Sequence, residues 1–85
     1  MHILYSQKFK RMYKKLPKEM QKIAKERIGI FQKNSSDPRL KTHKLHGAFS
    51  EFWSFSVTHS YRIVFEFADE NTANFHLIGN HAVYQ

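Results

Sequence analysis

The chain has 85 residues, of which 41% are hydrophobic and 15% aromatic. This supplies one packed core and no room for a second, so we expect a single domain over residues 1–85. The absence of cysteine excludes disulfides, a thiol nucleophile and Cys-ligated zinc, and no apolar run approaches the ~20 residues of a membrane span.

Positive charge is concentrated in the first half of the chain. Residues 1–47 carry 13 Lys/Arg against 3 Asp/Glu, a charge of +10, whereas residues 48–85 carry 1 against 4, a charge of −3. A field this uneven attracts polyanions. The charge therefore favours nucleic acid, an anionic membrane surface or an acidic protein as partner. The alternative is a solvated lysine-rich helix face.

The first third of the chain is predicted to form a short strand and two helices. Residues 2–5 (HILY) favour a strand, and Ser6 can cap a helix after it. Apolar residues then follow helical spacing, first at Phe9, Met12, Tyr13 and Leu16, then at Met20, Ile23, Ala24, Ile28 and Phe31. Pro17 separates the two helices, because a first helical position tolerates its missing N–H. Residues 34–38 (NSSDP) end the second helix.

After residue 38 the apolar period changes to two, which is typical of strands. The alternating segments are residues 53–57, 61–67 and 75–78, joined by turns at 58–60 and 69–72. The predicted class is α+β with the order β-α-α-β-β-β, an N-terminal helical hairpin packed on one face of an antiparallel sheet. If Ile63 and Phe65 meet the helices, Arg62 faces the open side of the sheet, where a ligand can reach it.

The second half carries side chains that together can cleave RNA without a metal. Such cleavage needs a base for the 2′-OH, an acid for the 5′-oxygen and a cation for the pentacovalent phosphorane. Histidine exchanges protons at neutral pH, and the arginine fork matches phosphate oxygens. Arg62 is the only Lys/Arg after Lys44, which favours a specific role for it. The alternative is an ion pair with Glu51 or Glu66.

Three further residues are candidates for catalysis. His81 follows the last predicted strand and could project from the sheet edge, or it could be a terminal histidine without a role. Tyr84 could stack on a base, donate its phenol proton or close the core. His43 lies at the start of a basic segment. His59 and His76, in a turn and a strand, are interpreted as structural.

Several basic residues are candidates for binding RNA backbone, although each could equally belong to a solvated surface. They are Lys8, Arg11, Lys15, Arg39, Lys41, Lys44 and His46. The histidines lack the spacing of a zinc site, and no P-loop or dinucleotide fingerprint is present. We therefore expect no metal and no cofactor.

In their order and amino-acid sequence these segments resemble the RelE/ParE superfamily of bacterial toxins, in particular its RelE/YafQ-like mRNA endonucleases. The similar segments are HKLHG (43–47), FWSFSV (52–57), YRIVF (61–65) and GNHAVY (79–84), after an early helical hairpin. The resemblance covers nearly the whole chain. It implies a RelE-like fold and a type II toxin. Such a toxin enters the ribosomal A site and cuts mRNA without metal by 2′-OH attack, leaving a 2′,3′-cyclic phosphate.

Residue by residue, the resemblance implies catalytic roles for Arg62 as phosphate stabiliser, for the near-terminal His81, and for His43 before Leu-x-Gly. Tyr84 lies close to a terminal aromatic of the family. The chain departs from the YafQ-like pattern where that pattern has a histidine, an aspartate and an acidic residue. The corresponding residues here are Ser56, Ser60 and Ala82.

The resemblance also implies partners and a location. The implied partners are a cognate acidic antitoxin, the ribosome and mRNA, and the toxin and antitoxin together can assemble on operator DNA. The implied location is the cytoplasm, and no membrane is involved. Two alternatives stay open. One is a non-enzymatic module, either a ParE-like gyrase inhibitor or a catalytically decayed toxin. The other is a general RNA-binding domain.

Overall fold

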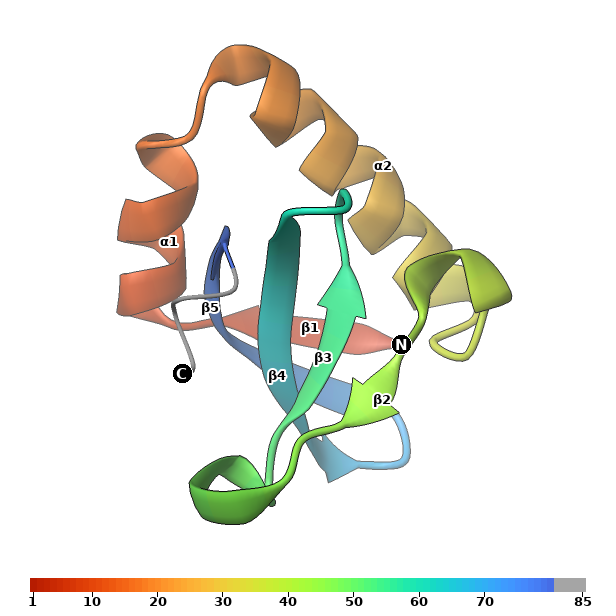
Figure 1. Cartoon of the computed structure of the whole chain (residues 1–85). Helices are drawn as coiled ribbons and strands as arrows, with labels where there is room; N and C mark the ends of the chain where they lie inside the picture. Colours follow the sequence, from red (N-terminus) through yellow and green to blue (C-terminus); the bar gives the residue numbers. More distant parts are fainter. Residues whose placement is uncertain (81–85) are drawn as a thin grey trace.

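A computed structural model describes residues 1–80 and places two helices against one face of a five-stranded sheet (Figure 1). The helices are α1 (Gln7–Lys14) and α2 (Lys18–Lys33), and single 3-10 turns lie at η1 (Pro38–Leu40) and η2 (Gly47–Phe49). The strands are β1 (His2–Tyr5), β2 (His43–Lys44), β3 (Trp53–Ser56), β4 (Tyr61–Asp69) and β5 (Thr72–Asn80). The predicted α+β class is confirmed. None of the helices within residues 1–80 is long and apolar enough to cross a membrane.

The helical hairpin begins and turns where the sequence predicts. The Ser6 hydroxyl accepts a hydrogen bond from the Phe9 N–H at 2.9 Å and donates one to the His76 carbonyl at 2.8 Å, so it caps α1 and ties it to β5. Pro17 directly precedes α2. The Gln21 amide donates to the carbonyls of Tyr13 and Leu16, both at 3.1 Å, and so satisfies backbone groups at the end of α1.

Aromatic side chains fill the space between the helices and the sheet. Phe31 of α2 stacks on Phe55 with ring centroids 4.9 Å apart and meets the edges of Phe65 and Phe75 at 5.0 and 5.3 Å. All four rings are fully buried. Ile63 lies on the same sheet face, which confirms that the alternate residues of β4 turn toward the helices.

The sheet is mixed, so the prediction of an antiparallel sheet is wrong at one edge. Its order is β1-β5-β4-β3-β2, and β1 runs parallel to β5 while the other pairs are antiparallel. The helical hairpin carries the chain across the sheet before β2, which leaves β1 free to pair with the last strand. Alternation of apolar residues shows that a segment is a strand, but not its direction. The two residues of β2 are too few to show any period.

The sheet face opposite the helices is only partly open. Ser54, Val64 and Leu45 have exposed fractions of 0%, 3% and 7%. The segment from 45 to 52 lies against part of this face. The Leu45 N–H donates to the Phe52 carbonyl at 2.9 Å, and the Phe52 ring meets the edge of His76 at 5.0 Å. Arg62 lies at one end of this face and is half-buried.

Candidate functional site

Arg62 lies on the sheet face away from the helical hairpin, in register with Ser56 of β3 and Gly79 of β5. Its Nη1 atom donates a hydrogen bond to the Ser56 hydroxyl at 2.7 Å. The glycine on the other side contributes no side chain. The guanidinium is therefore directed over β3. This confirms the predicted face of Arg62.

A hollow of about 270 Å³ surrounds this guanidinium and gathers four cationic side chains from separate parts of the chain. They are Arg27 of α2, Arg39 of η1, Lys41 after it and Arg62 of β4. Polar lining comes also from Ser56, Thr58 and His59, and none of the lining residues within 1–80 is acidic. We call it the Arg62 pocket. Cations gathered around one concavity create a positive potential that attracts phosphate groups.

Local contacts hold the cations on the helix side of the Arg62 pocket. Arg27 donates from Nη1 to the Arg39 carbonyl at 3.5 Å. The Arg39 guanidinium meets both carboxylate oxygens of Asp37, Nη2 to Oδ2 at 2.8 Å and Nε to Oδ1 at 3.0 Å. The hydrogen bond from the Arg39 side chain is the largest cause that lowers the pKa of Asp37 to about 2. Asp37 therefore stays ionised at neutral pH and fixes the fork of Arg39.

His59 lies in the turn between β3 and β4 and lines the Arg62 pocket. The turn is closed by backbone hydrogen bonds from Val57 and Thr58 to the Tyr61 carbonyl at 2.9 and 3.2 Å. The Thr58 hydroxyl also accepts from the Tyr61 N–H at 3.1 Å. The sequence suggested a structural role for this histidine. Its place beside Arg62 makes it a further group that could contact an anion.

Arg27 is the cation of the pocket that the sequence analysis did not single out. A signal for it was present, because it stands three residues after Ala24 and four before Phe31, both fully buried. Residues at these spacings share one side of a helix. An arginine on the buried side of α2 has to reach a polar space at the edge of the core, and here that space is the Arg62 pocket.

His43 lies on the same sheet face as Arg62 but outside the Arg62 pocket. It pairs with Ser54, which pairs with Val64. Ordinary strand spacing and rise therefore put the Cα atoms of His43 and Arg62 roughly 12 Å apart. Its Nδ1 atom lies 2.9 Å from the Lys41 carbonyl oxygen. A carbonyl can only accept, so Nδ1 carries the proton and Nε2 of the neutral ring is left as an acceptor.

The remaining predicted RNA-binding residues are exposed but are not gathered at the Arg62 pocket. Lys8, Arg11 and Lys15 belong to α1 and its end, which lies beside β5 and away from β2 (Figure 1). Lys44 pairs with Trp53 and so projects from the face opposite to His43. His46 precedes η2 and is exposed.

His81 and Tyr84, both predicted to be catalytic, lie outside the described residues. The last described residue, Asn80, pairs with Tyr61, the neighbour of Arg62 in β4. His76, interpreted as structural, donates a hydrogen bond from Nε2 to the Glu66 carboxylate at 3.0 Å.

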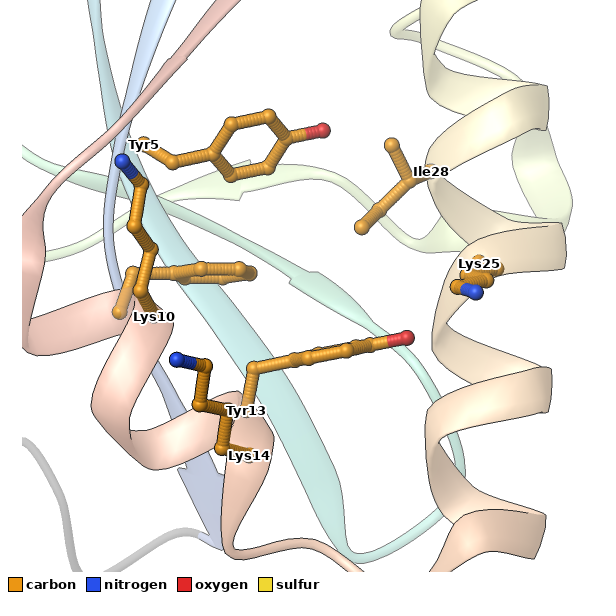
Figure 2. Close-up of a pocket in the computed structure, with 7 residues that line it drawn as sticks. Tyr5, Lys10, Tyr13, Lys14, Lys25 and Ile28 are labelled. Carbon is orange, nitrogen blue, oxygen red and sulfur yellow. The ribbon is translucent and has the colours of Figure 1, made fainter.

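A second pocket, of about 300 Å³, lies between the two helices (Figure 2). Tyr5, Phe9, Tyr13 and Ile28 line its floor, and the rings of Phe9 and Tyr13 stack at 6.3 Å. Lys10, Lys14 and Lys25 surround it. Burial, with a smaller contribution from Tyr13, raises the pKa of Tyr5, so its phenol stays protonated at neutral pH. We call this the aromatic pocket. It combines an apolar floor with a cationic rim.

No protein-family model and no curated protein sequence matches the chain. Solved structures do match its fold. The YoeB/ParE toxin from Agrobacterium tumefaciens superposes with a TM-score of 0.79 at 15% identity, over 95% of this chain and 99% of that one. YafQ from Escherichia coli strain BL21(DE3) has a TM-score of 0.79 at 17% identity, over 96% and 94%. The chain in a heterotetrameric YoeB–YefM toxin–antitoxin complex from Staphylococcus aureus has a TM-score of 0.76 at 22% identity, over 95% and 97%.

These likenesses cover nearly the full length of both partners in each comparison. The chain therefore has the fold of the RelE/ParE toxins, as the order of its segments predicted.

Proposed function

From this fold we propose that the chain is the toxin of a type II toxin–antitoxin pair that cuts mRNA on the ribosome without a metal or cofactor. The observation that carries the proposal is the Arg62 pocket, where the described part of the chain places four cations and no acidic side chain around one small hollow. A negatively charged phosphorane is the species that such an arrangement stabilises best.

In the proposed reaction the 2′-oxygen attacks the adjacent phosphorus and the bond to the 5′-oxygen breaks. The products are a 2′,3′-cyclic phosphate and a 5′-hydroxyl. Arg62 stabilises the phosphorane charge, and His43 takes the 2′-OH proton through Nε2, which its contact with Lys41 leaves as an acceptor. His81 gives a proton to the leaving 5′-oxygen, and Tyr84 orients a base. Arg39 and Lys41 hold the neighbouring backbone.

The role of His43 gives a prediction that depends on pH. His43→Ala should lower the cleavage rate about 10²-fold or more, since a positioned general base contributes typically 10²–10⁴. It should also remove the limb of the pH–rate profile in which activity rises as a histidine loses its proton. His2→Ala, which removes an exposed histidine from β1 at the opposite edge of the sheet, is the matched control. A His43→Ala variant that keeps the parent's pH profile would exclude His43 as the base.

We propose the aromatic pocket as a docking site for the antitoxin. Its apolar floor suits an aliphatic or aromatic side chain, and its three lysines suit flanking carboxylates. The S. aureus YoeB structure holds such a toxin with YefM, described as its antitoxin partner. An acidic amphipathic segment is the partner that matches both features of this pocket.

Charge reversal at the rim tests this docking site. Lys10→Glu with Lys14→Glu should weaken binding of an acidic amphipathic peptide at least about tenfold, because like charges then face each other. Lys8→Glu with Lys15→Glu makes the same charge change on α1 outside the pocket and should have a smaller effect. Equal weakening by both pairs, measured by calorimetry, would show general charge attraction instead.

The fate of mRNA and of DNA separates this function from its rivals. Expression of the chain should arrest growth and fragment translated mRNA, while gyrase supercoiling in the presence of the purified protein stays unaffected. Inhibition of supercoiling with intact mRNA would support a ParE-like inhibitor. Binding to free RNA with a steep salt dependence and without growth arrest would support a general RNA-binding domain.

A further inference from the structure

A second hollow adjoins the Arg62 pocket. It has a volume of about 510 Å³ and is lined by Ile23, Glu26 and Ile30 of α2 together with four residues of the Arg62 pocket. The four shared residues are Arg27, Arg39, Val57 and Thr58. The two hollows therefore form one groove between α2 and the turn that joins β3 to β4. We call the part beyond Arg27 the Glu26 hollow.

The two ends of this groove differ in chemistry. Arg62, Lys41 and His59 lie only at the first end, and two isoleucines with one carboxylate lie only at the second. Arg27 and Arg39 stand between them. Phosphates favour the cationic end, whereas the flat apolar face of a base favours contact with aliphatic carbon. A nucleotide carries both a phosphate and a base, and one sugar separates them.

Glu26 is the feature that a simple phosphate groove does not explain. It is exposed, and it forms no ion pair with any side chain of residues 1–80. A carboxylate beside bound phosphate weakens the attraction of the groove for RNA by like-charge repulsion. It becomes favourable when the ligand presents hydrogen-bond donors to it, because a carboxylate only accepts.

We propose that the Glu26 hollow binds the base of the nucleotide next to the cleaved phosphate and that Glu26 selects guanine there. The assignment of RNA as the ligand rests on the proposed function. Arg27, with Arg39, binds the phosphate of this nucleotide, and Ile23 and Ile30 contact the base. Guanine carries two adjacent donors on its pairing edge, N1–H and the 2-amino group, which match the two carboxylate oxygens. Adenine, cytosine and uracil each offer only one donor group on that edge, and the N3–H of uracil is flanked by two carbonyl oxygens, which repel a carboxylate.

Binding of short RNAs to the full chain tests this proposal directly. The probes are fluorescent pentaribonucleotides that are identical except for a central guanine, adenine, cytosine, uracil or hypoxanthine, the last of which lacks the 2-amino group. The parent protein should prefer guanine over uracil about tenfold, as expected for one bidentate contact. Hypoxanthine should lose most of that preference. Equal affinity for all five probes would overturn the proposal.

Two substitutions separate base recognition from phosphate binding. Glu26→Gln should remove the preference for guanine, whereas Arg27→Ala should weaken all five probes by a similar factor and keep the preference. Glu19→Gln removes the same charge from α2 outside the groove and should leave the preference intact. If Glu26→Gln instead strengthens binding of all five probes equally, Glu26 is only a repelling surface charge and the proposal is wrong.

Guanine recognition by Glu26 and the proposed nuclease function can each be disproved without the other. Binding of the pentaribonucleotides requires neither the ribosome nor cleavage, so a guanine preference that depends on Glu26 stands even if the chain cuts no mRNA. Conversely, if Glu26→Gln changes neither the rate nor the positions of mRNA cleavage, the proposed nuclease function stands and guanine recognition by Glu26 is wrong.

Discussion

Replacing Arg62 with alanine is expected to lower the rate of ribosome-bound mRNA cleavage by about 10²–10³, as loss of one preorganised charge-stabilising contact typically does. Arg62 belongs to β4, and its hydrogen bond to Ser56 directs the guanidinium over β3. Its charge is therefore already in place when the phosphorane forms. A single-turnover measurement on programmed ribosomes isolates this step from binding.

Two companion variants show whether the effect of Arg62→Ala is chemical. Arg62→Lys keeps the charge but loses the fork, and it should recover only a small part of the rate. Ser56→Ala keeps the guanidinium and removes the group that orients it, so its rate should lie between those of Arg62→Ala and the parent. An Arg62→Ala variant that cuts at the parent's rate would remove this residue from the mechanism.

Replacing Phe31 with alanine is expected to destabilise the fold by about 3–5 kcal/mol, the usual loss for a buried phenylalanine. The ring contacts Phe55, Phe65 and Phe75 and is fully buried. The total free energy of unfolding of a native domain is about 5–15 kcal/mol, so this loss is comparable with the lower end of that range. Urea unfolding followed by tryptophan fluorescence measures it, since Trp53 packs against the same core.

The loss of stability should depend on how much side-chain volume is removed at position 31. Phe31→Leu retains most of the volume and is expected to lose less than about 1.5 kcal/mol. Equal losses in the two variants would mean that the aromatic packing does not anchor α2. Since α2 also carries Arg27, its displacement would disturb the Arg62 pocket as well.

Much of the fold follows from spacing along the chain. Ser6 and Pro17 mark the helix starts, and the alternate apolar residues of 53–57 and 61–67 give the strands and the face of Arg62. The parallel pairing of β1 with β5 does not follow, because alternation is the same for either direction. The burial of Ser54 and Val64 on the face opposite the helices also escapes prediction, because alternation alone assigns this face to solvent.

The candidate site was predictable only in part. Arg39, Lys41 and Arg62 were chosen from charge and isolation, and the fold brings all three to one hollow. Arg27 and His59 join them where α2, η1 and the β3–β4 turn meet. Helical spacing places Arg27 on the buried side of α2, but it does not show which part of the sheet this side meets. The basic residues of α1 had the same sequence signal as Arg39 but lie elsewhere, because charge alone does not specify where a helix packs.

The most direct test is primer extension on a reporter mRNA translated in a reconstituted system, with purified protein and with ribosomes present or omitted. The proposed function predicts new 5′ ends that appear only with ribosomes and are lost with Arg62→Ala. Intact mRNA in both reactions, with protein shown to be folded, would contradict it.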